Sequence, residues 1–133
     1  MYLYISSRDS KSLFPDNTKR HFRANLASRI SLPNLRYKVA LVEYYGIIPP
    51  DTYIDINLSV LSDSLVEGSK SSIIRRLYGQ SQTRTLYTPA NLLYVPVRQL
   101  NFDCLEVNIT ESQASVTSDP DDYCIILLHI AKL

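Results

Sequence analysis

Glycine, tryptophan and histidine are scarce in this chain of 133 residues. It contains three glycines, no tryptophan, one methionine and two histidines. Three isolated glycines cannot form a glycine-rich phosphate loop or a dinucleotide-binding fingerprint. The two histidines form no His-x-His pair for a cupin-type metal centre, and neither lies in a signature that pairs a nucleophile with its base. The sequence therefore predicts a protein that is not an enzyme and that uses no cofactor or metal.

Cysteine is also rare, and the two thiols, Cys104 and Cys124, do not form a Cys-x-x-Cys motif. A zinc site or a thioredoxin-like redox site is therefore unsupported. We expect two buried free thiols, and a disulfide stays open only if the side chains face each other. The acidic run at 119–122 offers oxygen ligands for calcium, but the ligand spacing of a known loop is missing, so we interpret it as a solvated turn.

No run of about 18 apolar residues exists that would span a bilayer. The short apolar run at 1–5 is followed by mixed charge and not by a small-residue cleavage site, so we do not interpret it as a signal peptide. These absences predict synthesis in the cytosol and no membrane partner. The hydrophobic fraction of 45% and the charged fraction of 20% are typical of one folded domain, which we expect to span residues 1–133.

Short segments with alternating apolar and polar residues, separated by Pro, Gly and Ser-rich turns, predict strands along the whole chain. We expect them at 2–6, 21–32, 37–45, 52–60, 72–78, 83–87, 92–97, 102–109 and 123–131. A helix remains the alternative for 21–32. We expect a loop at 61–70 and a short turn at 79–82 that joins its two flanking strands. The segment 123–131 is apolar on both faces, which predicts a strand that is central or covered on both sides.

Eight to nine strands without a convincing helix favour an all-β sandwich or barrel. We predict an eight-stranded antiparallel sandwich with the topology of a single jelly roll. The charge distribution supports this choice, because residues 1–38 carry eight Lys or Arg against two Asp, whereas residues 99–133 carry one Lys against six acidic residues. Opposite charges at the two ends indicate that these ends lie side by side, or meet head to tail in neighbouring subunits.

A basic cluster in the first third is the main candidate for a binding surface. It consists of Lys19, Arg20, Arg23, Arg29, Arg36 and Lys38. Such a cluster makes a subunit contact, or a weak, salt-dependent contact with the phosphates of packaged nucleic acid. A third interpretation is a solvated strand edge, where Lys and Arg discourage unwanted pairing.

Several segments together resemble a known family of viral proteins. These are Phe-Pro-Asp-Asn-Thr at 14–18, a polar strand ending at Leu32-Pro33, Tyr-Lys-Val-Ala-Leu-Val-Glu-Tyr at 37–44, and the closing segments at 94–97, 102–109 and 126–132. The pattern resembles that of the minor capsid, or penton, proteins of polinton-like viruses and adintoviruses, and it covers about half of the chain. Ala40 stands where that family usually has Gly, and the middle of this chain is short.

The resemblance implies a single jelly roll that assembles as a pentamer at the vertices of an icosahedral virion, beside a larger major capsid protein. It implies a role in the shell, whereas the short middle argues against a receptor-binding insertion. Five matching positions would serve the fold or a subunit contact: Phe14, Asn17, Leu41, Glu43 and His129. The alternative function is a soluble β-sandwich binding module, lectin-like or polyanion-binding, that recognises a ligand through exposed Tyr and Arg.

Overall fold

The computed structural model describes residues 1–31, 36–60, 64–66, 69–71, 73–97, 101–113 and 122–132. It describes the side chains of these residues except at 27–31, 64–66, 69–71 and 101–103. All described secondary structure is β, so no described helix is available to cross a membrane.

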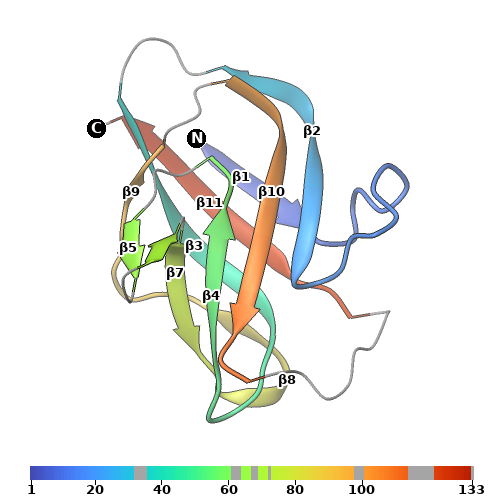
Figure 1. Ribbon diagram of the computed structural model, residues 1–133, viewed down its shortest axis with the longest axis vertical. Coiled ribbons are helices and arrows are strands. Elements are labelled where there is room, and N and C mark those ends of the chain that lie inside the picture. Colours follow the sequence, from blue (N-terminus) through green and yellow to red (C-terminus); the bar gives the residue numbers. More distant parts are fainter. Residues whose placement is uncertain are drawn as a thin grey trace.

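Two antiparallel sheets are stacked face to face, and the strands of one cross those of the other obliquely (Figure 1). The first sheet has the order β1 (Tyr2–Ser6), β11 (Ile125–Lys132), β3 (Tyr37–Ile48) and β8 (Ser81–Tyr87), with β9 (Val95–Pro96) also beside β3. The second sheet has the order β2 (His21–Ser31), β10 (Asn101–Glu111), β4 (Tyr53–Leu58) and β7 (Ile73–Tyr78). A small hairpin joins β5 (Ser64–Val66) and β6 (Ser69–Ser71).

The strands pair from the two ends of the chain inward. β1 pairs with β11, β2 with β10, β3 with β8, and β4 with β7, all antiparallel. Every step between successive long strands changes sheet, except the step from β4 to β7. The first and last strands are therefore neighbours, with Tyr2 opposite His129 and Ser6 opposite Ile125. This confirms the prediction that the two ends of the chain lie side by side.

The all-β sandwich is confirmed, and two details of the prediction are wrong. The two sheets contain nine described strands, within the expected eight to nine; the ninth is the two-residue strand β9, which lies in the expected segment 92–97 and pairs with the start of β3. The expected loop at 61–70 contains most of the β5–β6 hairpin. The strands β7 and β8 do not pair with each other, because their two-residue connection at 79–80 crosses from one sheet to the other. The segment from His21 forms strand β2, which removes the helical alternative.

The connection between β7 and β8 needs a glycine for reasons of space. A Cβ on Gly79 would lie 1.8 Å from the carbonyl oxygen of Pro49. The Gly79 N–H also donates a hydrogen bond to the carbonyl of Thr52, at 2.8 Å. The β3–β4 turn and the β7–β8 crossing are therefore packed backbone against backbone.

One apolar cluster fills the space between the sheets. Its largest fully buried members include Phe22, Leu41, Tyr44, Ile54, Ile56, Leu58, Leu105, Ile126 and Leu128. They alternate along their strands with residues on the outer faces, as the two-residue period of a strand requires, except where an irregularity in the pairing of β3 with β11 lets Leu41 and Tyr44 both face the core. Leu41, which the resemblance gave as a fold position, lies in this core.

Candidate interaction surface

Half of the predicted basic cluster is neutralised inside the chain. The Lys19 ammonium lies 2.5 Å from a carboxylate oxygen of Asp122, the Arg20 guanidinium forms an ion pair with Glu111, and Arg23 lies 3.6 Å from Glu106. Each cation comes from the N-terminal third and each anion from the C-terminal third. Three of the opposite charges of the two ends are therefore paired within one subunit.

Arg20 connects the two sheets at one end of the sandwich. Its Nε donates to Glu111 of β10, its Nη1 donates to the Tyr44 hydroxyl at 3.0 Å, and its Nη2 donates to the Ile47 carbonyl at 3.0 Å. Burial lowers the pKa of the guanidinium, but Tyr44 and Glu111 raise it by more, so its net pKa is raised. Arg20 is therefore a structural cation, and a polyanion would have to compete with three existing hydrogen bonds.

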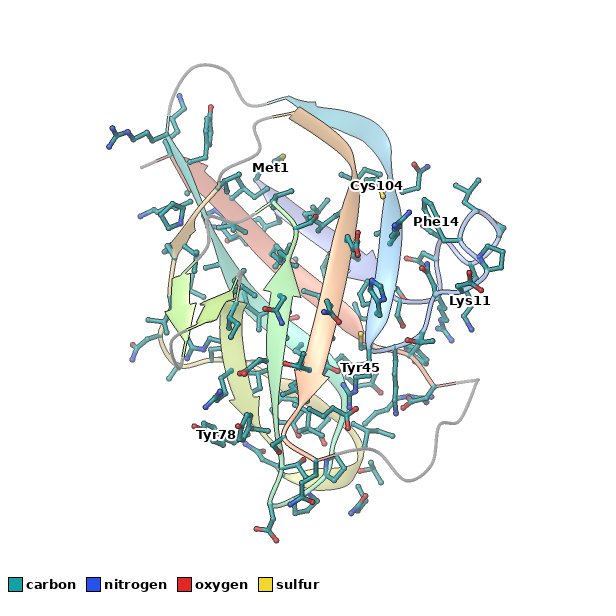
Figure 2. The ribbon with its side chains drawn as sticks, viewed as in Figure 1. Met1, Lys11, Phe14, Tyr45, Tyr78 and Cys104 are labelled. Carbon is teal, nitrogen blue, oxygen red and sulfur yellow. The ribbon has the colours of Figure 1, made fainter. Side chains whose placement is uncertain are left out.

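The thiol of Cys124 lies in the same buried region. Burial raises its pKa to about 11, so at neutral pH it is protonated and a poor nucleophile. Neither cysteine is in a disulfide, and Cys104 lies on β10 (Figure 2), whereas Cys124 directly precedes β11 of the other sheet. The expectation of two thiols outside a disulfide is confirmed, although Cys104 is only partly buried.

Two other members of the cluster lie together at one end of the first sheet. Arg36 is exposed just before β3, and Lys38 lies at its start. The register of β11 against β3 adds Lys132, which the sequence did not group with them because it lies 94 positions after Lys38. We call these three residues the basic end. Within the described residues none of the three forms an ion pair, whereas the side chain of Arg29 lies outside the described part.

The loop before β2 closes the free edge of that strand. The Asn17 side chain is 8% exposed, and its amide pairs with both backbone groups of Arg23: Nδ2 donates to the carbonyl and Oδ1 accepts from the N–H, each at 2.9 Å. The Ser10 hydroxyl accepts from the N–H of Asn25 at 2.9 Å. Phe14 lies in the same loop, beside β2 (Figure 2), with its ring 5.9 Å from the Arg23 guanidinium. The Asn17 amide thus satisfies the two backbone groups of Arg23 that a further neighbouring strand would otherwise bond.

The edge of β1 is different. Met1 and Ile130 exchange two backbone hydrogen bonds, so the backbone groups of Tyr2 and Tyr4 point away from β11. Within the described residues nothing bonds these outward groups. Both tyrosine side chains are also about two-thirds exposed, at 67% and 65%. This edge of the first sheet is open to a further chain.

The outer face of the first sheet is largely apolar. Cross-strand rows place Tyr2 with His129, Tyr4 with Leu127 and Glu43, and Ile125 with Tyr45 and Leu86. His129 Nδ1 forms a hydrogen bond with the Tyr94 hydroxyl, at 2.7 Å. The rings of Tyr2 and His129 are also in contact, with their centres 4.7 Å apart. His129 is thus a partly buried residue of the outer face, held by two tyrosines.

A shallow depression lies in this apolar face. It has a volume of about 280 Å³, and we call it the Glu43 groove; its lining residues are Tyr4, Glu43, Tyr45, Leu86, Ile125 and Leu127. The Tyr4 hydroxyl reaches over β11 to the Glu43 carboxylate, at 3.4 Å. Glu43 is the single acidic residue among the lining residues, and it forms no ion pair with any described residue.

The outer face of the second sheet is polar and internally paired. Arg76 donates two hydrogen bonds to the Asp55 carboxylate, at 2.7 and 2.9 Å, and His21 lies 2.8 Å from Glu106. These pairs cross between neighbouring strands, as opposite charges on a solvated sheet face do. The two outer faces of the sandwich therefore differ, one polar and satisfied, the other apolar with an unneutralised carboxylate.

No group of His, Cys, Asp and Glu among the described side chains is arranged to hold a metal ion. Residues 119–121 of the acidic run lie outside the described part, and Asp122 is engaged with Lys19. No protein-family model, curated protein or solved structure matches this chain. The case for a function therefore rests on its strand order and on the chemistry of its surface.

Proposed function

We propose that this chain is a structural subunit of a virus shell, a penton-like minor capsid protein with a single jelly roll. In this proposal it forms a cyclic homo-oligomer, a pentamer, at the vertices of an icosahedral virion and contacts a major capsid protein there.

The strand order is the observation that carries the proposal. A jelly roll is a long antiparallel ribbon of paired strands that is rolled into two sheets. Such a ribbon pairs the first long strand with the last, the second with the second last, and so on inward. The pairings β1–β11, β2–β10, β3–β8 and β4–β7 follow this rule. The sequence resemblance to penton proteins points to the same fold independently.

The apolar outer face supports a role in assembly. Large exposed apolar patches on folded domains mark sites of contact with other proteins, and tyrosine is enriched in such contacts. Tyr2, Tyr4 and Leu86 are each more than half exposed on this one sheet. The open backbone edge of β1 lies along the same face and offers further hydrogen bonds to a neighbour.

The size of the purified protein in solution tests the proposal. Sedimentation velocity at micromolar to millimolar concentration, followed by electron microscopy, should show a closed ring of subunits. A species that stays monomeric over this range would contradict a shell role. If that monomer binds a glycan array or an oligonucleotide at physiological salt, the chain is the alternative, a soluble binding module with Tyr4 and Tyr45 as stacking surfaces.

A further inference from the structure

Glu43 is a carboxylate that pairs with no cation of the described residues, and it lies in largely apolar surroundings. Its groove is lined otherwise by three aliphatic and two tyrosine side chains, and the Tyr4 hydroxyl lies 3.4 Å from its carboxylate. A partly desolvated charge is unfavourable unless a counter-charge or several hydrogen bonds compensate it. One neutral hydrogen bond at this distance is weak compensation, so the groove suits an incoming cation.

The basic end carries positive charges that lack an acidic partner. Arg36, Lys38 and Lys132 lie close together where β3 begins and β11 ends, and no described acidic residue pairs with them. Lys38 lies against an aromatic surface, with its Nζ 4.3 Å from the centre of the Tyr94 ring. Tyr94 in turn bonds His129 on the outer face of the first sheet, so the basic end and the Glu43 groove belong to the same face.

These two unmatched features do not satisfy each other within one subunit. Lys38 lies opposite Ala131 and Glu43 lies opposite Leu127, four positions apart on β11, which is roughly 13 Å at about 3.3 Å per residue. The Lys38 ammonium lies against the ring of Tyr94 at its own end of the sheet, and it does not pair with Glu43. A second copy of the chain can bring the two charges together.

We propose that the Glu43 groove receives the basic end of a neighbouring copy, in a head-to-tail contact along the first sheet. The apolar walls of the groove pack against the hydrocarbon stems of Lys or Arg, while Glu43 pairs with the charged tip. Because the two surfaces differ, the contact is heterologous, and repetition of it closes a ring when the rotation between copies permits. This inference rests on the proposed cyclic oligomer and names the residues that hold it together.

Nucleic acid fits the basic end and the Glu43 groove less well than a second copy of the chain does. Phosphates would neutralise the basic end but would be repelled by Glu43, so the groove would stay empty. A second copy matches both features with one contact, and we therefore argue for the copy.

Charge reversal at each side of the contact tests the proposal. Glu43→Lys should raise the apparent dissociation constant of the oligomer by about tenfold or more, as loss of an enclosed interfacial ion pair does. Arg36→Glu combined with Lys38→Glu should have a similar effect. The matched control for Glu43→Lys is Asp16→Lys. Asp16 is exposed in the loop before β2, and its replacement changes the net charge of the chain by the same amount as Glu43→Lys.

Mixing the two reversed proteins makes the test specific for a head-to-tail contact. The reversed groove of one variant and the reversed basic end of the other again carry opposite charges, and the remaining two surfaces are intact. Each variant alone should therefore stay largely monomeric, whereas an equimolar mixture should regain association with the two variants in equal amounts, measured by native mass spectrometry. Glu43→Gln, which keeps the shape of the side chain, should weaken the oligomer by less than Glu43→Lys and should reduce its sensitivity to salt. Circular dichroism and thermal unfolding of each variant show whether it is folded.

The outcomes separate this inference from the proposed function. A wild-type protein that never associates contradicts the proposed function itself. A ring that forms equally well in wild type, Glu43→Lys and Asp16→Lys overturns the head-to-tail contact and leaves the shell role intact. If the doubly reversed basic end still forms the ring but loses binding of a single-stranded oligonucleotide, the basic end faces nucleic acid and the inference is wrong.

Discussion

Replacing Asn17 with alanine should destabilise the protein, because this side chain takes the place of a neighbouring strand. The substitution removes two hydrogen bonds to Arg23, each of 2.9 Å, from a site that is 8% exposed. At about 1 kcal/mol for each bond, and somewhat more where a backbone group is left unsatisfied, we expect a loss of about 2–3 kcal/mol. In a domain of this size, such a loss lowers the midpoint of thermal unfolding by roughly 6–12 °C.

Urea unfolding of the wild type, Asn17→Ala and Ser10→Ala measures this loss. Ser10→Ala is the matched comparison, because it removes the single bond to Asn25 and should cost about 1 kcal/mol. Hydrogen exchange should also become faster at the Arg23 amide in Asn17→Ala. If Asn17→Ala costs less than about 0.5 kcal/mol, or no more than Ser10→Ala, the edge of β2 does not depend on the Asn17 amide.

Three further substitutions or treatments have clear expected results. Gly79→Ala should cost about 2–3 kcal/mol in urea unfolding, because its Cβ meets the Pro49 carbonyl at 1.8 Å, and a neutral result would refute the close packing of the two turns. Burial raises the pKa of Asp122, but Lys19, the Tyr123 N–H and Arg84 together lower it by more, so its net pKa is lowered and its stabilisation is present above the ordinary value of 3.8. Asp122→Asn should therefore lose about 2 kcal/mol at pH 7, and the difference from wild type should shrink as the pH falls below about 4; a constant difference would contradict this linkage. Cys124, with its pKa raised to about 11, should react with iodoacetamide far more slowly in the native protein than in urea, and equal rates would show that it is not buried.

Much of the fold follows from the alternation of apolar residues. The strands from Tyr37 and from Ile125 were expected from β-branched and aromatic runs, and the apolar residues on both faces of 123–131 indicated a central strand. The change of sheet at 79–80 could not be predicted, because a hairpin turn and a crossing between layers have similar local sequences. The pairing of β7 with β4 and of β8 with β3, in different sheets, distinguishes the two.

The surface was less predictable than the core. Charge counts indicated that the two ends of the chain attract each other. They did not show that Lys19, Arg20 and Arg23 form ion pairs inside the subunit, whereas Arg36 and Lys38 form none with the described residues. The Glu43 groove needs the register of four strands, β1, β11, β3 and β8, which lie far apart in the sequence. The resemblance named Glu43, but its lack of a cation is visible only in three dimensions.

The position of Arg20 also affects how the sandwich would come apart. Its guanidinium donates to Glu111 of one sheet and to Tyr44 and Ile47 of the other, so it crosslinks the two sheets at one end of the sandwich. Under mechanical load, we expect this end of the sandwich to separate last and the opposite end to separate first.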